Sequence, residues 1–135
     1  MNEKILAVDD DFTTLKIIET ILKNNGFVTT CYSSPLDALK SFEVSEYDLV
    51  LSDFYMPELN GDEFLKKIRS KDKYVPFVIL TVNDDVKNAI SLLKNGDDDY
   101  INKPIVKDEL IFRITKNIKE KENKLLGIST PINLE

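Results

Sequence analysis

The stretch Ile5-Leu6-Ala7-Val8-Asp9-Asp10-Asp11 decides the fold class, because four apolar residues run directly into three acidic ones. An apolar run this short, without alternating polar residues, is typical of a strand that is buried on both faces. Strands of that kind occur mostly in parallel sheets that helices cover on both sides. The acidic residues then mark the carboxyl end of the first strand.

Further short apolar segments follow, and amphipathic helical patterns separate them. The other expected strands are Val28 to Tyr32, Leu49 to Leu51 ending at Asp53, Phe77 to Leu80 ending at Thr81, and Tyr100 to Ile101. The expected helices carry apolar residues at Leu15, Ile18 and Leu22; Leu36, Leu39 and Phe42; Phe64, Leu65 and Ile68; Val86, Ile90 and Leu93; and Ile111, Ile114 and Ile118. Alternating strands and helices with right-handed crossovers predict an α/β fold, a three-layer doubly wound sandwich around a parallel sheet.

Size and composition indicate one soluble domain. The chain has 135 residues, 42% of them apolar and 31% charged, as in an ordinary globular domain. The longest apolar runs, such as Phe77 to Leu80, are far shorter than the roughly 20 residues needed to cross a membrane. The start Met1-Asn2-Glu3-Lys4 lacks the pattern of a signal peptide, so we expect a cytoplasmic protein without membrane contact.

The residue types present exclude several kinds of chemistry. Cys31 is the single cysteine and the chain has no histidine, which argues against internal disulfides, zinc, haem and iron–sulfur sites and excludes serine–histidine and cysteine–histidine catalysis. The formal net charge of −6 makes the domain a poor non-specific binder of nucleic acid. Carboxylates, lysines and hydroxyls remain as the groups that carry function.

These groups gather at the expected carboxyl ends of the strands. The first strand ends in Asp9 and Asp10, the third in Asp53 and the fourth in Thr81, and Lys103 follows the fifth. Doubly wound sheets bind ligands at this edge. Clustered carboxylates repel one another, and a hard cation, Mg²⁺ with Mn²⁺ as the alternative, would offset that repulsion. The set suits phosphoryl transfer, in which a carboxylate can itself be the nucleophile.

Five segments together resemble a known family. They are Val8-Asp9-Asp10, Asp53-Phe54-Tyr55-Met56-Pro57, Asn60-Gly61, Thr81, and Asp99-Tyr100-Ile101-Asn102-Lys103-Pro104. In this order, each after its own strand, they resemble the receiver domain of two-component response regulators, a CheY-like fold. The resemblance covers roughly residues 3 to 122. It implies a five-stranded, flavodoxin-like sheet in the order 2-1-3-4-5.

The resemblance also implies the chemistry of the pocket. Asp53 matches the phosphoacceptor and contributes to the metal site. Asp9 and Asp10 match the acidic pair that organises Mg²⁺, with the backbone carbonyl of Tyr55 completing the protein ligands. Lys103 matches the lysine that contacts the phosphoryl oxygens.

The remaining implied roles concern switching. Thr81 matches the hydroxyl that moves toward the phosphoryl group, and Tyr100 matches the aromatic residue that turns inward on activation. Pro104 matches a position with a cis peptide bond. The responding surface would be the fourth helix, fifth strand and fifth helix.

The resemblance further implies the partners. A sensor histidine kinase or phosphotransfer protein would donate the phosphoryl group, and an unidentified partner, an output domain or a second copy would read the switch. Such a domain accepts its own phosphoryl group and slowly hydrolyses it, so it is not a turnover enzyme in the usual sense.

Two alternatives stay open at this point. Asp9-x-Asp11-x-Thr13 also resembles the first motif of haloacid-dehalogenase-type phosphatases, although Lys103 follows the late acidic residues instead of preceding them. The chain could also be a receiver-like interaction module that does not use phosphorylation. Asp11 is interpreted as a helix-starting residue or as an acid that supports its neighbours.

Two positions depart from the family pattern, and the C-terminal segment is ambiguous. Val82 stands where a small residue is common and should crowd the phosphoryl group, and Asp97 adds charge beside the fifth strand. Residues 1–122 form the expected receiver domain, and 123–135 form an extension or a linker to an output region. The charge-rich stretch at 119–124 is either a helical extension or part of that linker.

Overall fold

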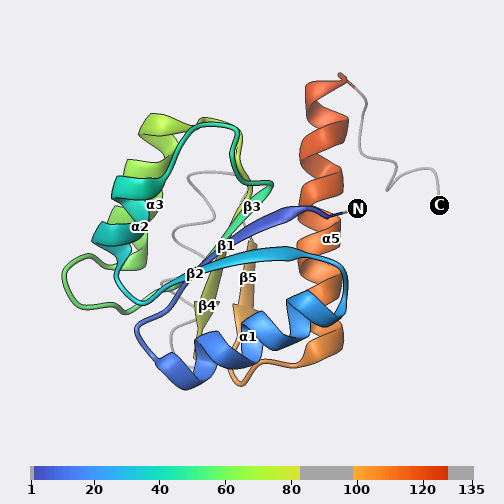
Figure 1. The fold of residues 1–135 in the computed structure, drawn as a ribbon. Coiled ribbons are helices and arrows are strands. Elements are labelled where there is room, and N and C mark those ends of the chain that lie inside the picture. Colours follow the sequence, from blue (N-terminus) through green and yellow to red (C-terminus); the bar gives the residue numbers. More distant parts are fainter. Residues whose placement is uncertain (1, 83–98, 128–135) are drawn as a thin grey trace.

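The fold is a parallel sheet between two layers of helices (Figure 1). The computed structural model describes residues 2–82 and 99–127. Its elements are β1 (Lys4–Val8), α1 (Phe12–Asn24), β2 (Val28–Tyr32), α2 (Pro35–Ser41), β3 (Leu49–Asp53), α3 (Gly61–Lys71), β4 (Phe77–Thr81), β5 (Asp99–Asn102) and α5 (Lys107–Leu125). The expected helix with Val86, Ile90 and Leu93 lies outside the described residues.

The five strands lie in the order β2-β1-β3-β4-β5, and each neighbouring pair is parallel. This confirms the predicted α/β class and strand order. The register pairs Val8 with Ser52, Asp53 with Leu80, and Thr81 with Asn102. The strand ends are therefore level, and the residues that follow them share one edge of the sheet.

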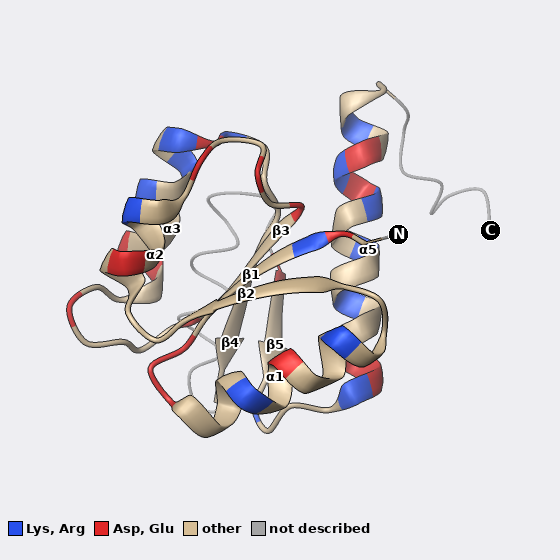
Figure 2. Ribbon diagram, in the orientation of Figure 1, with Lys and Arg blue, Asp and Glu red and all other residues tan. Residues whose placement is uncertain are grey.

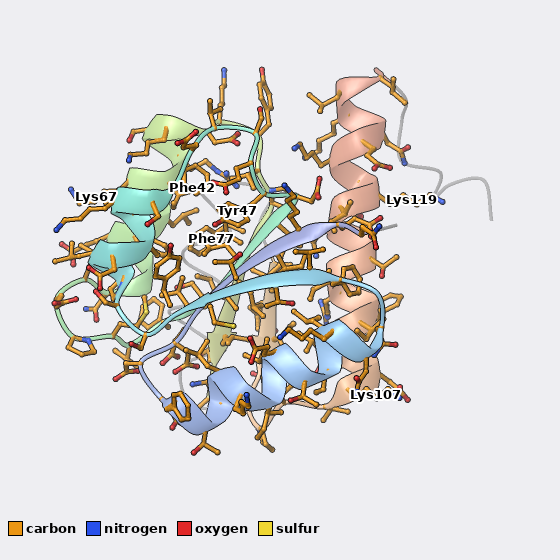
Figure 3. All side chains as sticks on the ribbon, viewed as in Figure 1. Phe42, Tyr47, Lys67, Phe77, Lys107 and Lys119 are labelled. Atoms are coloured by element: carbon orange, nitrogen blue, oxygen red, sulfur yellow. The ribbon has the colours of Figure 1, made fainter. Side chains whose placement is uncertain are left out.

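Each face of the sheet has its own hydrophobic core, because side chains alternate along buried strands. In β1, Leu6 and Val8 face α2 and α3, whereas Ile5 and Ala7 face α1 and α5. Figure 3 shows Phe42, Tyr47 and Phe77 within the first of these cores, with Lys67 pointing into solvent. Figure 1 shows α2 and α3 on one side of the sheet and α1 and α5 on the other.

Side chains cap the first turns of α1 and α2, and one expected helix end is corrected. Asp11 caps α1 by accepting a hydrogen bond from Thr13 N, and Ser34 caps α2 by accepting one from Asp37 N. Helix α2 ends at Ser41, so the expectation that Phe42 continues the helix was wrong. Phe42 adopts an extended backbone at the helix end, and this places its ring in the core.

Helix α5 is the longest described element, at 19 residues. Its buried side chains are Leu110, Ile114, Asn117 and Ile118, and the predicted Ile111 is only half-buried. The helix continues through the charge-rich stretch to Leu125, so that stretch is a helical extension. Among the described residues, no helix is long and apolar enough to span a membrane.

Asp72 joins two loops at the edge of the sheet opposite the acidic loop. Its carboxylate is buried and accepts hydrogen bonds from the backbone N–H groups of Ser45, Tyr74 and Val75. Burial raises the pKa of Asp72, but these three hydrogen bonds outweigh it, so its pKa lies below the usual value. Asp72 therefore holds the segments before β3 and before β4 together.

We expect Asp72→Asn to lower the free energy of unfolding by about 1–3 kcal/mol at pH 7, because the amide nitrogen cannot accept hydrogen bonds. The folded-state pKa is lowered, so the contribution is present above the unfolded pKa and is lost as pH falls through the folded pKa. Urea unfolding at pH 7 and pH 3 measures both effects. A difference between parent and variant that does not shrink at pH 3 would contradict this account.

Candidate functional site

The candidate site begins in the acidic loop between β1 and α1, which Figure 2 shows as a red segment. Asp9 is completely buried, and its Oδ1 accepts a hydrogen bond of 2.9 Å from Asp11 N. Asp11 Oδ2 accepts a 2.7 Å hydrogen bond from the Thr14 hydroxyl. The Asp11 side chain therefore caps α1, as the helix-starting interpretation suggested, and its backbone N–H holds Asp9. Asp10 is exposed, and one of its carboxylate oxygens lies within 4.8 Å of an oxygen of Asp9 and of Asp53.

Asp53 lies at the end of β3 with only 9% of its surface exposed. Its Oδ1 accepts a hydrogen bond of 2.9 Å from Phe54 N and lies 3.2 Å from Lys103 Nζ. Burial and the charge of Asp9 raise the pKa of Asp53 from 3.8 to about 6, against the lowering effects of Lys103 and the Phe54 N–H. A cation that joined this site would favour the ionised carboxylate.

Lys103 bridges the two buried carboxylates. Its Nζ lies 3.0 Å from Asp9 Oδ2 and 3.2 Å from Asp53 Oδ1. Burial lowers the pKa of Lys103, but Asp9 and Asp53 raise it by more, so the ammonium stays charged well above neutral pH. Its backbone N–H donates a 2.6 Å hydrogen bond to Thr81 O, and the following bond to Pro104 is cis. The chain thus anchors Lys103 beside the end of β4.

The three carboxylates fit a hard divalent cation. Asp9, Asp10 and Asp53 each offer one oxygen, and these oxygens all lie within 4.8 Å of one another. Asp9 Oδ2 is buried and, among the described residues, has the ion pair with the Lys103 ammonium at 3.0 Å but no hydrogen bond. A buried anionic oxygen in that situation suits Mg²⁺, which prefers carboxylate oxygens and keeps several waters.

Thr81 and Tyr55 lie close to this centre along their strand ends, whereas Tyr100 lies within β5. Thr81 is buried, and its hydroxyl donates a 3.2 Å hydrogen bond to Val82 O. Tyr55 is 51% exposed, with its ring edge-on to Phe54 at 4.8 Å between ring centroids. Tyr100 is half-buried against the core beneath α2 and α3.

Two contacts in the site were missed by sequence reasoning. Ser52 is completely buried, and its Oγ donates a 2.9 Å hydrogen bond to Asp53 O. Gly61, which the sequence marked only as part of a motif, donates a 2.6 Å hydrogen bond from its N–H to Phe54 O. A serine inside an otherwise apolar strand was the available signal for the first contact.

Comparisons with known proteins agree with this geometry. The model of the response regulator receiver domain matches residues 5–115. The chain is 36% identical over 119 residues to the regulatory protein VanR of Enterococcus faecium, covering 88% of this chain and 51% of that protein. It is 32% identical over 124 residues to the DNA-binding response regulator MtrA of Mycobacterium leprae, covering 92% of this chain and 55% of that protein. The chain thus spans about half the length of these relatives.

Solved structures show the same fold. A response regulator receiver domain protein from Clostridium thermocellum has a TM-score of 0.81 and 31% identity, covering 92% of this chain and 98% of that one. The receiver domain of a sensor histidine kinase from Pseudomonas aeruginosa PAO1 has a TM-score of 0.78 and 29% identity, covering 88% and 99%. That structure has a magnesium ion coordinated in the active site cleft. The protein described here belongs to the response regulator receiver domain family, whose members are signalling phosphoacceptors of two-component systems.

Proposed function

We propose that Asp53 accepts a phosphoryl group from a phosphohistidine of a sensor histidine kinase or phosphotransfer protein. The observation that carries the proposal is the position of Lys103, whose ammonium lies within 3.2 Å of both Asp9 and Asp53. A charge-paired lysine beside a nearly buried carboxylate, with two further carboxylates that can hold a cation, suits phosphoryl transfer.

In the proposed step, a carboxylate oxygen of Asp53 attacks phosphorus and the phosphorus–nitrogen bond of the phosphohistidine breaks. The imidazole leaves with the electron pair and takes a proton from solvent, and Asp53 becomes an acyl phosphate. Phe54 N and Lys103 Nζ fix the Asp53 carboxylate through Oδ1 before the reaction. Lys103 then stabilises negative charge on the phosphoryl oxygens.

Asp9, Asp10 and Asp53, with the backbone carbonyl of Tyr55, would hold Mg²⁺, or Mn²⁺ in its place. The ion supplies charge neutralisation for the incoming phosphoryl group. The protein positions the ligands beforehand, because Asp11 N already holds Asp9 through its Oδ1.

Phosphorylation would be read through Thr81, Tyr100 and the surface formed by β5, α5 and the expected fourth helix, whose residues lie outside the described part. Within the described part, Asp99 ties β5 to α5 by accepting hydrogen bonds from Arg113 Nη1 at 2.8 Å and Asn117 Nδ2 at 3.0 Å. Burial raises the pKa of Asp99, but hydrogen bonds from Asn117, Tyr100 N and Arg113 lower it by more, so its pKa lies below the usual value. The two elements should therefore move together when Tyr100 shifts.

The proposed setting is a cytoplasmic signalling pathway. The output would be a protein partner, a second copy or an output domain in a longer regulator, since this chain matches only 55% of the length of the DNA-binding relative MtrA. Because this domain is acidic, we do not assign it direct contact with nucleic acid.

Incubation with Mg²⁺ and a small phosphodonor should add one phosphoryl group to the parent, measured by intact-protein mass. We expect no adduct with Asp53→Asn, because an amide cannot form the acyl phosphate. Asp37→Asn, at an exposed position in α2, is the matched control and should be phosphorylated like the parent. An adduct on Asp53→Asn equal to that of the parent would refute the assignment.

The variant Lys103→Met tests whether Lys103 acts in phosphoryl transfer without contributing to Mg²⁺ binding. It removes a positive charge that lies within 3.2 Å of two proposed ligand carboxylates, so Mg²⁺ affinity should equal or exceed that of the parent. The rate of phosphoryl adduct formation should fall by about 10²-fold, as when one stabilising donor is removed. Calorimetric Mg²⁺ titration and timed mass spectrometry measure the two effects. Loss of Mg²⁺ binding in this variant would contradict the separate roles.

Val82 is 42% exposed directly after Thr81, and its branched side chain should hinder access to a phosphoryl group on Asp53. Val82→Ala should therefore speed dephosphorylation by phosphatases and phosphorylation by small donors. The decay of phosphorylated protein, followed by mass spectrometry, tests this. Equal rates for parent and variant would show that Val82 does not control access.

A further inference from the structure

We propose that Ser52 and Gly61 act as positioning residues that hold the backbone of Asp53 and Phe54 in the geometry the metal site requires. The proposal rests on the proposed function, because it concerns the same pocket. We use the term backbone clamp for two hydrogen bonds, from Ser52 Oγ to Asp53 O at 2.9 Å and from Gly61 N to Phe54 O at 2.6 Å.

The clamp controls the phosphoacceptor through Phe54. The Phe54 N–H donates a hydrogen bond of 2.9 Å to Asp53 Oδ1, and the Phe54 carbonyl accepts the hydrogen bond from Gly61. The same peptide segment thus orients the Asp53 carboxylate at one end and is fixed to the first residue of α3 at the other. Phe54 also separates Asp53 from Tyr55, so both proposed ligand groups depend on its position.

The approach of α3 to this segment requires a glycine. A Cβ atom built on Gly61 would lie 2.9 Å from Asp53 O, 2.9 Å from Phe54 Cα and 3.2 Å from Phe54 O. All three atoms belong to the backbone, so no flexible side chain can move aside. Gly61 does not adopt a left-handed conformation, since the positive-φ glycines of the described chain are Gly26 and Gly127. Its requirement is therefore one of space alone.

A small displacement of this backbone should weaken Mg²⁺ binding strongly. Mg²⁺ demands near-octahedral geometry with ligand distances of about 2.0–2.1 Å, so a shift of a few tenths of an ångström weakens its binding. A Cβ at position 61 would push the backbone of Asp53 and Phe54 and the start of α3 apart. We infer that the site is shaped by where α3 begins as well as by its acidic side chains.

Gly61→Ala tests the clamp, and Gly26→Ala is the matched control. Gly26 has φ of +87° with nothing within 4 Å of a built Cβ, and it precedes β2, at the sheet edge opposite the site. The control should lose thermal stability through backbone strain but keep the Mg²⁺ affinity of the parent within twofold. Gly61→Ala should bind Mg²⁺ at least fivefold more weakly by calorimetric titration at a temperature where both variants are folded.

A second readout needs no metal. In metal-free protein, the amide resonances of Phe54 and Tyr55 should shift in Gly61→Ala and stay in place in Gly26→Ala. If Gly61→Ala does not fold, Ser52→Ala carries the test, because it removes the hydrogen bond to the same Asp53 carbonyl. Ser52→Ala should weaken Mg²⁺ binding at least twofold.

The outcomes separate this inference from the proposed function. If the parent does not bind Mg²⁺, the proposed function fails and the positioning role fails with it. If the parent binds Mg²⁺ and Gly61→Ala binds it equally well with unshifted Phe54 and Tyr55 amides, the clamp is refuted while the proposed function stands. If Gly61→Ala does not fold and Ser52→Ala binds Mg²⁺ with the affinity of the parent, the clamp is likewise refuted while the proposed function stands.

Discussion

The central constraint on this structure is the burial of two carboxylates, Asp9 and Asp53, next to one another at one edge of the sheet. Two like charges in a poorly solvated place are costly, and the raised pKa of Asp53 expresses that cost. Lys103 offsets it by lying within 3.2 Å of both. The site therefore holds more negative than positive charge, and a bound cation would offset the difference. The fold supplies the level strand ends that bring these three residues together.

Most of the architecture followed from residue pattern. Short apolar runs ending in polar residues defined the strands, and the parallel sheet placed Asp9, Asp53 and Lys103 at one edge because parallel strands end on the same side. Asp11 also caps its helix, as its interpretation as a helix-starting residue implied. The pattern failed at Phe42, since helical periodicity cannot tell the last turn of a helix from an extended residue that packs against the same core.

Other features depend on contacts between segments that lie apart in the sequence. Nothing local shows that Asp72 accepts hydrogen bonds from Ser45 N, 27 residues away, as well as from its own loop. Likewise, Gly61 looks like ordinary turn chemistry until the structure shows how closely α3 approaches the end of β3. The contact of Gly61 with Phe54 fixes the backbone that carries the Asp53 side chain. The identity of the side chains predicts the chemistry of the site. The exact positions of those side chains depend on packing between distant segments, which the sequence alone does not show.

The most direct test of the account is to locate the phosphoryl group itself. Borohydride reduces an aspartyl phosphate to homoserine, so treatment of the phosphorylated protein followed by peptide sequencing by mass spectrometry marks the residue that was modified. The account predicts homoserine at position 53 alone, because Asp53 keeps 9% of its surface exposed to an incoming donor, whereas Asp9 is completely buried. Homoserine at Asp9 instead would contradict it, since that residue would then be the nucleophile, as in the phosphatase alternative.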